Sequence, residues 1–194
     1  MKVITIISYV FFLTSSIASA SGRDDRENCE KKAGIFESSG SFVKNDVKHA
    51  VCLDEKKNSA KVNLSYNVII RDKDSKFAYN RKGIYGYFNG EVAFRYFETK
   101  GIFDPYGYFQ FQDTAGIIIY SQRNWAGFFG QTQTYYFYSL SLNSPIKRLI
   151  ISNLKRDFPN DGFIEEVKQL RFLNEKTQSN KYAINMLYAK YFSR

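Results

Sequence analysis

Short runs in which apolar and polar residues alternate fill the middle of this chain and constrain its fold more than any other feature. In residues 61–71, apolar side chains occupy the alternate positions Val62, Leu64, Tyr66, Val68 and Ile70. Side chains of a strand point alternately to its two faces, so this pattern is typical of one half-buried strand. We therefore predict β-structure across residues 59–142.

A turn signal at Asn89 and Gly90 predicts a hairpin within that region. The flanking runs, residues 83–88 and 92–99, have strand-like composition, and both turn residues tolerate the positive φ angles of a type I′ turn. Further strands are expected at residues 106–112, 116–121 and 131–142, with turn formers between them at residues 104–105, 113–116 and 122–124. This spacing predicts a mainly β, α+β fold on an antiparallel meander, either a curled sheet or a partly closed barrel.

Residues 143–194 change character and predict a helical or mixed C-terminal element of the same domain. Asp161 is expected to cap an amphipathic helix over residues 162–172 that packs on the sheet through an apolar stripe of Phe163, Val167 and Leu170. Residues 182–192 fit a helix and a strand equally well, so both assignments stay open.

Residues 1–20 have the pattern of a secretory signal peptide. A lysine at position 2 precedes an apolar run, and Ala18 and Ala20 form the small-residue cleavage pattern. We predict cleavage after Ala20, which makes the mature protein secreted or periplasmic. No later apolar stretch is long enough for a membrane-spanning helix, so no transmembrane helix is expected in the mature chain.

Cys29 and Cys52 are the two cysteines of the chain, and an oxidising compartment favours their pairing as a disulfide. The bridge is expected to hold down the polar segment of residues 21–58 more than a core does. The single histidine, His49, and the lack of a CxxC pattern argue against a metal site. We predict no metal and no cofactor.

Aromatic side chains make up 21 of the 62 residues between positions 77 and 138. Many must belong to the core, since sheets favour aromatic residues and each ring buries a large area. The strand at residues 131–142 nevertheless carries rings on both faces, and Trp125 lies close to glycines, as in a loop. Rings exposed together can bind a sugar, an apolar ligand or a partner protein. The candidate binding residues are Tyr106, Tyr108, Trp125, Phe128, Phe129, Tyr136 and Tyr138.

The leading functional prediction is a non-enzymatic module that binds a partner protein or a surface polysaccharide through this aromatic face. The net charge of +9 also suits an anionic surface, which an exported protein meets before nucleic acid, so no nucleic-acid partner is predicted. No nucleophile-elbow, phosphate-loop or HExxH motif occurs. The alternative is a glycosidase-like hydrolase that uses Glu98 and a second acid, because two carboxylates across a cleft perform that reaction.

Overall fold

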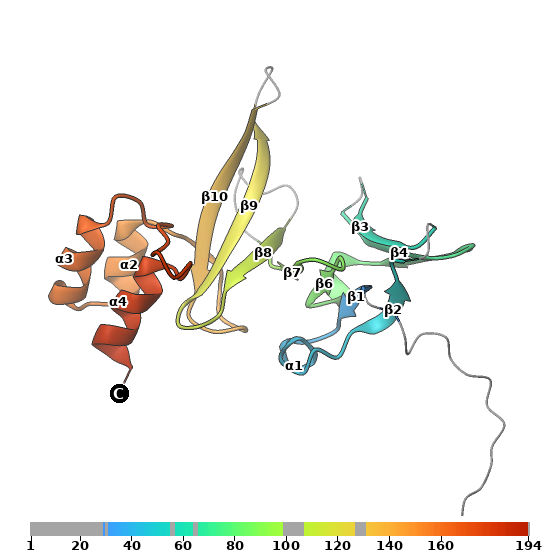
Figure 1. Ribbon diagram of the computed structural model, residues 1–194, viewed down its shortest axis with the longest axis horizontal. Coiled ribbons are helices and arrows are strands. Elements are labelled where there is room, and N and C mark those ends of the chain that lie inside the picture. Colours follow the sequence, from blue (N-terminus) through green and yellow to red (C-terminus); the bar gives the residue numbers. More distant parts are fainter. Residues whose placement is uncertain are drawn as a thin grey trace, which may run out of the picture.

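The computed structural model describes residues 29, 31–54, 57–63, 66–98, 107–126 and 131–193. Across these ranges a large sheet lies in the middle of an elongated molecule, with helices at one end and a small sheet at the other (Figure 1). The large sheet is formed by β1 (Lys32–Phe36), β2 (Lys48–Cys52), β6 (Gly86–Phe88), β7 (Ala93–Tyr96), β8 (Tyr108–Asp113), β9 (Ile118–Ala126), β10 (Gln131–Ser139) and β11 (Lys147–Arg148). The small sheet is formed by β3 (Ser59–Val62), β4 (Val68–Asp72) and β5 (Ser75–Tyr79).

Strand order confirms the prediction of a mainly β fold on an antiparallel sheet. Within the described ranges, the large sheet has eight strands in the order β11-β10-β9-β8-β7-β6-β1-β2, and the small sheet has the order β3-β4-β5. The strands from β6 to β11 pair in chain order, which is the predicted meander. As far as the described strands go, neither sheet closes into a barrel.

The N-terminal segment contributes a core strand to the large sheet. β1 lies between β6 and β2, and its residues Ala33, Ile35 and Phe36 are buried. The expectation that the disulfide holds this segment more than a core does is therefore wrong for β1. The strand was hard to recognise from the sequence, because Ala33, Gly34, Ile35 and Phe36 follow one another without polar residues between them. Such a short strand shows no period-two alternation.

β3 and β4 pair as an antiparallel hairpin, so the prediction of a single strand over residues 61–71 is wrong. Val62 at the end of β3 pairs with Val68 at the start of β4. Asn63 makes the turn, because its side-chain oxygen accepts a hydrogen bond from the backbone N–H of Asn67, and Tyr66 has a φ of +60°. The alternation of apolar and polar residues could not reveal the turn. Core-facing residues have even numbers in both strands of the hairpin, so the alternation continues through the turn.

The predicted hairpin at Asn89 and Gly90 is present, with a different turn. Phe88 of β6 pairs with Ala93 of β7, so the loop has four residues and is not the two-residue type I′ turn. Gly90 has a φ of +96°, which explains the glycine at this position. The turn expected at residues 122–124 is wrong, because β9 runs unbroken through them in register with β10.

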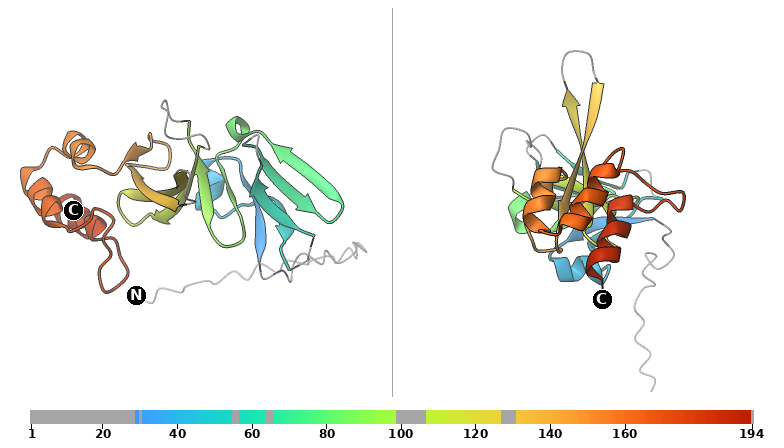
Figure 2. Two further views of the ribbon diagram at one scale, coloured as in Figure 1. Left: turned by 90° about the horizontal axis from the view of Figure 1, so that it is seen from above. Right: turned by 90° about the vertical axis from the view of Figure 1, so that its left-hand side faces the viewer.

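The helices pack on one end of the large sheet, as predicted for the C-terminal element. Besides the short α1 (Ser39–Val43), they are α2 (Ile151–Asp157), α3 (Asp161–Gln169) and α4 (Ala183–Phe192). The cap of α3 is Asn160 rather than Asp161, with its side chain accepting from the N–H of Phe163 at 3.0 Å. α4 decides the open assignment of residues 182–192 in favour of a helix. Figure 2 shows these helices stacked together and the β9–β10 hairpin projecting from the body.

Helices and sheet share one buried cluster. Ile119 and Tyr138 from the sheet belong to the same cluster as Leu154 of α2, Phe163 of α3 and Ile184 of α4, and all five are essentially inaccessible to solvent. A second cluster, which includes Ile35, Ile70 and Tyr108, lies between the two sheets.

No helix in the described part of the chain has both the length and the hydrophobicity that crossing a lipid bilayer requires. The signal peptide expected at residues 1–20, with cleavage after Ala20, lies outside the described residues.

Candidate functional site

The predicted aromatic residues do not form one exposed face among the described residues. Tyr108 is buried between the two sheets, where burial raises its pKa and its hydroxyl donates to the carbonyl of Tyr66. Tyr138 is fully buried under the helices and donates to Asp157 at 2.7 Å. Tyr136 is half-buried at the margin of that helical cluster. Tyr108 and Tyr138 therefore contribute to packing, in two different clusters.

The remaining predicted residues are only partly covered by the structure. Tyr106, Phe128 and Phe129 lie outside the described residues. The backbone of Trp125 belongs to β9 and pairs with Thr132, so the expected loop position is wrong. The Trp125 side chain is not among those described.

Glu98, the acid of the predicted hydrolase alternative, lies on the surface just beyond β7. Its side chain is 62% exposed, and its carboxylate forms an ion pair with the Lys82 ammonium group at 3.2 Å. A hydrolase of the predicted kind needs its two carboxyl groups across a cleft from each other. Glu98 is not among the lining residues of the two hollows described below.

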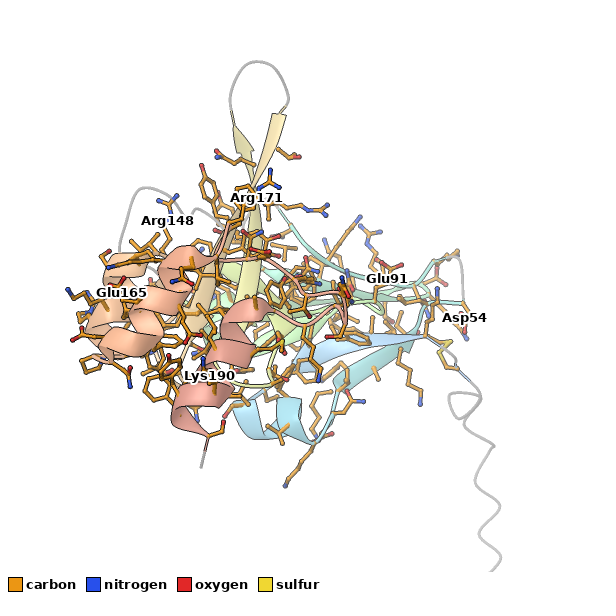
Figure 3. The ribbon with its side chains drawn as sticks, turned by 60° about the vertical axis from the view of Figure 1, so that its left-hand side comes forward. Asp54, Glu91, Arg148, Glu165, Arg171 and Lys190 are labelled. Atoms are coloured by element: carbon orange, nitrogen blue, oxygen red, sulfur yellow. A yellow bond between two sulfur atoms is a disulfide. The ribbon has the colours of Figure 1, made fainter. Side chains whose placement is uncertain are left out.

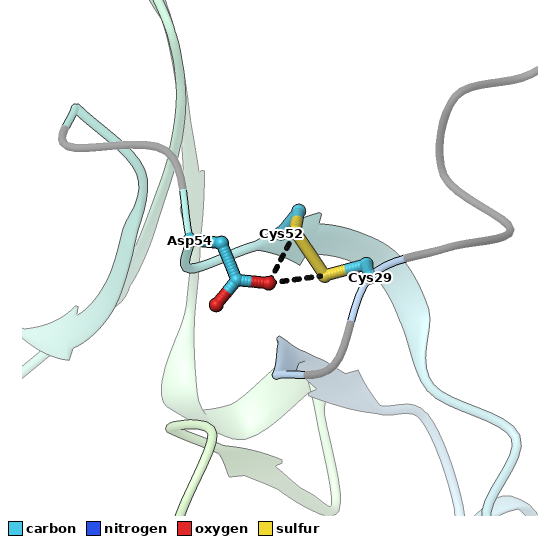
Figure 4. A group of neighbouring side chains, drawn as sticks. All are labelled: Cys29, Cys52 and Asp54. Carbon is cyan, nitrogen blue, oxygen red and sulfur yellow. Dashed lines mark hydrogen bonds between the residues drawn. A yellow bond between two sulfur atoms is a disulfide. The ribbon is translucent and has the colours of Figure 1, made fainter.

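The predicted disulfide between Cys29 and Cys52 is present, with 5.6 Å between their Cα atoms. Figure 4 shows the carboxylate of Asp54 beside it, with one oxygen 3.4 Å from Cys52 Sγ and 3.8 Å from Cys29 Sγ. In the described part of the chain, these three residues are the one group of potential metal ligands. Because the two sulfurs are bonded to each other, they do not offer the thiolates that a metal site needs.

The carboxylate of Asp54 should slow reduction of this disulfide. Reduction needs an attacking thiolate and releases a second one, and both are repelled by a negative charge about 4 Å away. We expect Asp54→Asn to speed reduction by dithiothreitol about threefold at low salt, with a smaller effect at high salt. Alkylation and mass measurement follow the reaction. Asp46→Asn, at another exposed acid, is the control, and equal rates for all three proteins would contradict the effect.

The candidate binding site is a groove at the outer edge of β10, where the sheet meets the helical end. We call it the β10 groove; it has a volume of about 260 Å³ and is lined by residues 134–136, 148–150 and 172–174. β10 supplies the first wall, the segment from β11 to α2 the second, and the segment after α3 the third. Figure 3 shows Arg171 at the base of the projecting hairpin and Arg148 to its left, above the helices.

Large apolar side chains are exposed in the β10 groove. Phe172 is 58% exposed and Ile150 is 39% exposed, beside the half-buried rings of Tyr135 and Tyr136. Exposed apolar residues scattered singly need no explanation, but a group of them around a hollow marks an interaction site.

Two arginines hold positive charge over the rings of the β10 groove. The guanidinium carbon of Arg148 lies 5.0 Å from the ring centre of Tyr135, and that of Arg171 lies 5.3 Å from that of Phe172. Stacking leaves the N–H groups at the rim of a guanidinium free to bind carboxylates. Among the described residues that line the groove there is no aspartate or glutamate.

A second hollow, which we call the polar cleft, lies on the sheet near the β6–β7 turn. It has a volume of about 430 Å³, and its lining includes Glu91, Phe94, Tyr108, Gln110 and Arg123. A lining that combines aromatic rings with polar side chains suits a hydroxyl-rich ligand.

Sequence reasoning missed Phe172, Ile150 and Arg148. A signal for Phe172 exists, because it is a large apolar residue outside the predicted stripe of Phe163, Val167 and Leu170. In the structure it follows the end of α3 at Gln169. Arg148 belongs to the basic pair with Lys147. Their meeting with Tyr136 depends on long-range packing, which no local pattern encodes.

Comparisons with protein-family models, with curated proteins and with solved structures find no match to this chain.

Proposed function

We propose that this chain is an exported, non-catalytic binding module that holds a partner protein in the β10 groove. The observation that carries the proposal is the exposure of Phe172 and Ile150 together around a hollow at a sheet edge. Interfaces gain most of their binding energy from a few large side chains buried in such hollows, and aromatic residues and arginine are enriched among them.

Export is supported by two independent features. The first twenty residues have the composition and cleavage pattern of a signal peptide. The Cys29–Cys52 disulfide suits the oxidising environment that exported proteins meet.

A surface polysaccharide is the second candidate ligand, and the polar cleft favours it. Planar polar side chains such as Gln110 beside the rings of Phe94 and Tyr108 can bind sugar hydroxyls and sugar faces together. We rank it below the protein partner, because Tyr108 is only 7% exposed and so offers little ring surface for stacking.

The test of the proposed function is the loss of peptide binding in Phe172→Ser. Peptides selected from a random display library against the intact protein supply the probe. Loss of a central aromatic anchor costs about 2 kcal/mol, so we expect affinity for the tightest peptide to fall about 30-fold. Calorimetry measures the change.

Met186→Ser is the matched control, because Met186 is 50% exposed and lies outside the β10 groove, on α4. It should leave the affinity unchanged. Equal affinity of the Phe172→Ser variant and the unaltered protein would exclude the groove as the binding site.

A further inference from the structure

Among the described residues, the outer edge of β10 is open along the half that projects from the body of the molecule (Figure 1). β9 pairs with β10 along its whole length, from Gln131 to Ser139. On the other side, β11 pairs with Phe137 and Tyr138, and the N–H of Leu149 donates to the carbonyl of Tyr136 at 2.9 Å. In the described part of the chain, residues 131–135 have no strand on that outer side.

The main-chain groups at this open edge are those of Thr132 and Thr134. In an antiparallel strand the N–H and C=O of one residue point to the same side, and the side alternates along the strand. The carbonyl of Tyr136 points toward β11, so those of Thr134 and Thr132 point to the same edge. Both threonine side chains are exposed. An extended chain laid along this edge can therefore exchange main-chain hydrogen bonds with β10.

The edge strand β2 and the part of β10 that extends beyond β11 differ in their protection against such pairing. Proteins usually protect an edge strand with lysine, proline, bulges or irregular backbone. β2 has this protection, because it begins with Lys48, His49 has a φ of +47°, and its register with β1 shifts. β10, with the sequence QTQTYYFYS, has no lysine or proline, and its register with β9 is unbroken.

The charges near the open edge favour an acidic occupant. Arg148 and Arg171 stack on rings of the β10 groove, and the exposed Arg123 pairs with Thr134 across the hairpin. A second copy of the chain paired edge to edge would place these arginines against each other, with a net charge of +9 on each molecule. An acidic segment is attracted instead.

We propose that the partner contributes an extended acidic segment, which adds as a strand to the outer edge of β10 and places an apolar side chain in the β10 groove. This inference rests on the proposed function and names its binding mode. Main-chain hydrogen bonds with Thr132 and Thr134 fix the position and direction of the bound segment. The groove selects an apolar side chain of that segment, and the arginines select acidic residues next to it.

The probe is the synthetic peptide acetyl-EVEFEVE-amide, which alternates acidic and apolar residues. Two versions carry N-methyl groups on alternate amides, one for each side of the extended peptide. Methylation of the side that faces β10 removes its hydrogen bonds, so one version should bind at least about tenfold more weakly than the other. Equal affinity of both versions and the unmodified peptide would overturn strand addition. The lysine analogue, acetyl-KVKFKVK-amide, should bind at least about tenfold more weakly, and equal binding would overturn the acidic preference.

Thr134→Pro removes the same hydrogen bonds from the side of the protein. The N–H of Thr134 points away from β9, and proline is tolerated at such positions of an edge strand. We expect at least about a tenfold loss of peptide affinity in Thr134→Pro and a clearly smaller loss in Thr134→Val, which changes the side chain but keeps the N–H. Amide hydrogen exchange of the unaltered protein tests the same hydrogen bonds if the proline variant does not fold. In the unaltered protein, peptide should slow exchange at Thr132 and Thr134, and unchanged exchange at both would overturn the inference.

The outcomes separate this inference from the proposed function. Binding that is weakened by Phe172→Ser but not by N-methylation or Thr134→Pro would leave the groove as the site and exclude strand addition. Binding that none of these changes weakens would exclude both. Sedimentation of the free protein should give a monomer, and a dimer that Thr134→Pro dissociates would show that the occupant is a second copy.

Discussion

Replacement of Arg95 by methionine is expected to lower the free energy of unfolding by about 3 kcal/mol. Arg95 lies on β7 and is only 4% exposed, and no carboxylate pairs with it among the described residues. Its guanidinium group donates to the Tyr120 hydroxyl at 3.0 Å, to Ser139 Oγ at 3.4 Å and to the carbonyl of Ser144 at 2.9 Å. These contacts join β7 to β9, β10 and the loop that follows β10.

Aromatic rings take the place of a counter-ion around Arg95. Its guanidinium carbon lies 5.5 Å from the ring centres of Tyr85 and Phe97 and 5.9 Å from that of Tyr120. Cation–π contacts of a desolvated arginine are each worth up to about 2 kcal/mol. Methionine fills part of the space but satisfies none of the acceptors, so the loss of hydrogen bonds outweighs the relief of a desolvated charge.

Urea unfolding measures the effect of Arg95→Met. Arg123→Met removes an exposed arginine from β9 and should change stability by less than about 0.5 kcal/mol. Arg95→Lys keeps the charge but cannot reach all three acceptors, and should fall between Arg95→Met and the unaltered protein. A methionine variant as stable as the unaltered protein would mean that desolvation of the guanidinium group cancels its contacts.

Asp157→Ala is expected to destabilise the fold by a similar amount, about 3 kcal/mol. The Asp157 side chain is only 7% exposed. It accepts from the Tyr138 hydroxyl and the Lys147 ammonium group, both at 2.7 Å, and so joins α2 to β10 and β11. Alanine would leave the buried Tyr138 hydroxyl without its acceptor and the partly buried Lys147 without its counter-ion.

The same carboxylate makes stability depend on pH. Burial acts to raise the pKa of Asp157, but hydrogen bonds from Lys147 and Tyr138 and the nearby cations outweigh it and hold the pKa below its ordinary value of 3.8. A carboxyl group with a depressed folded-state pKa stabilises the fold above its unfolded pKa, and this stabilisation is lost as the pH falls through the folded-state value.

Asp157→Asn isolates this effect, because it keeps an acceptor for Tyr138 and removes the charge. The difference in unfolding free energy between the unaltered protein and Asp157→Asn should be constant near neutral pH and should shrink below about pH 4. Urea unfolding at a series of pH values measures it. A difference that persists unchanged at pH 2 would show that the charge of Asp157 does not stabilise the fold.

The sequence predicted those parts of the fold that local patterns encode. The β6–β7 hairpin followed from Asn89 and Gly90, α3 followed from the stripe around Phe163, and the disulfide followed from Cys29 and Cys52. The β3–β4 hairpin was missed because the apolar–polar alternation shows only which residues share a face of a strand. A turn that keeps the alternation in step on both sides leaves no trace in this pattern.

The candidate site was harder to predict, because it depends on which rings reach the surface. Tyr108 and Tyr138 sit on strands like Tyr135 and Tyr136, yet partners from distant segments cover them: the small sheet covers Tyr108, and the helices cover Tyr138. The amino-acid composition shows that the chain has many aromatic rings, but it does not show which rings other segments bury. The open edge of β10 depends on β11 being only two residues long, a boundary that periodicity cannot fix.

Nuclear magnetic resonance of the labelled protein during titration with acetyl-EVEFEVE-amide tests the proposed site most directly. Amide shifts should change most at residues 132–136, 148–150 and 172–174, which line the β10 groove and its open edge. Shifts at Gln110 and Glu91 in the polar cleft should stay unchanged. Changes confined to the polar cleft, with none in the β10 groove, would contradict the proposal.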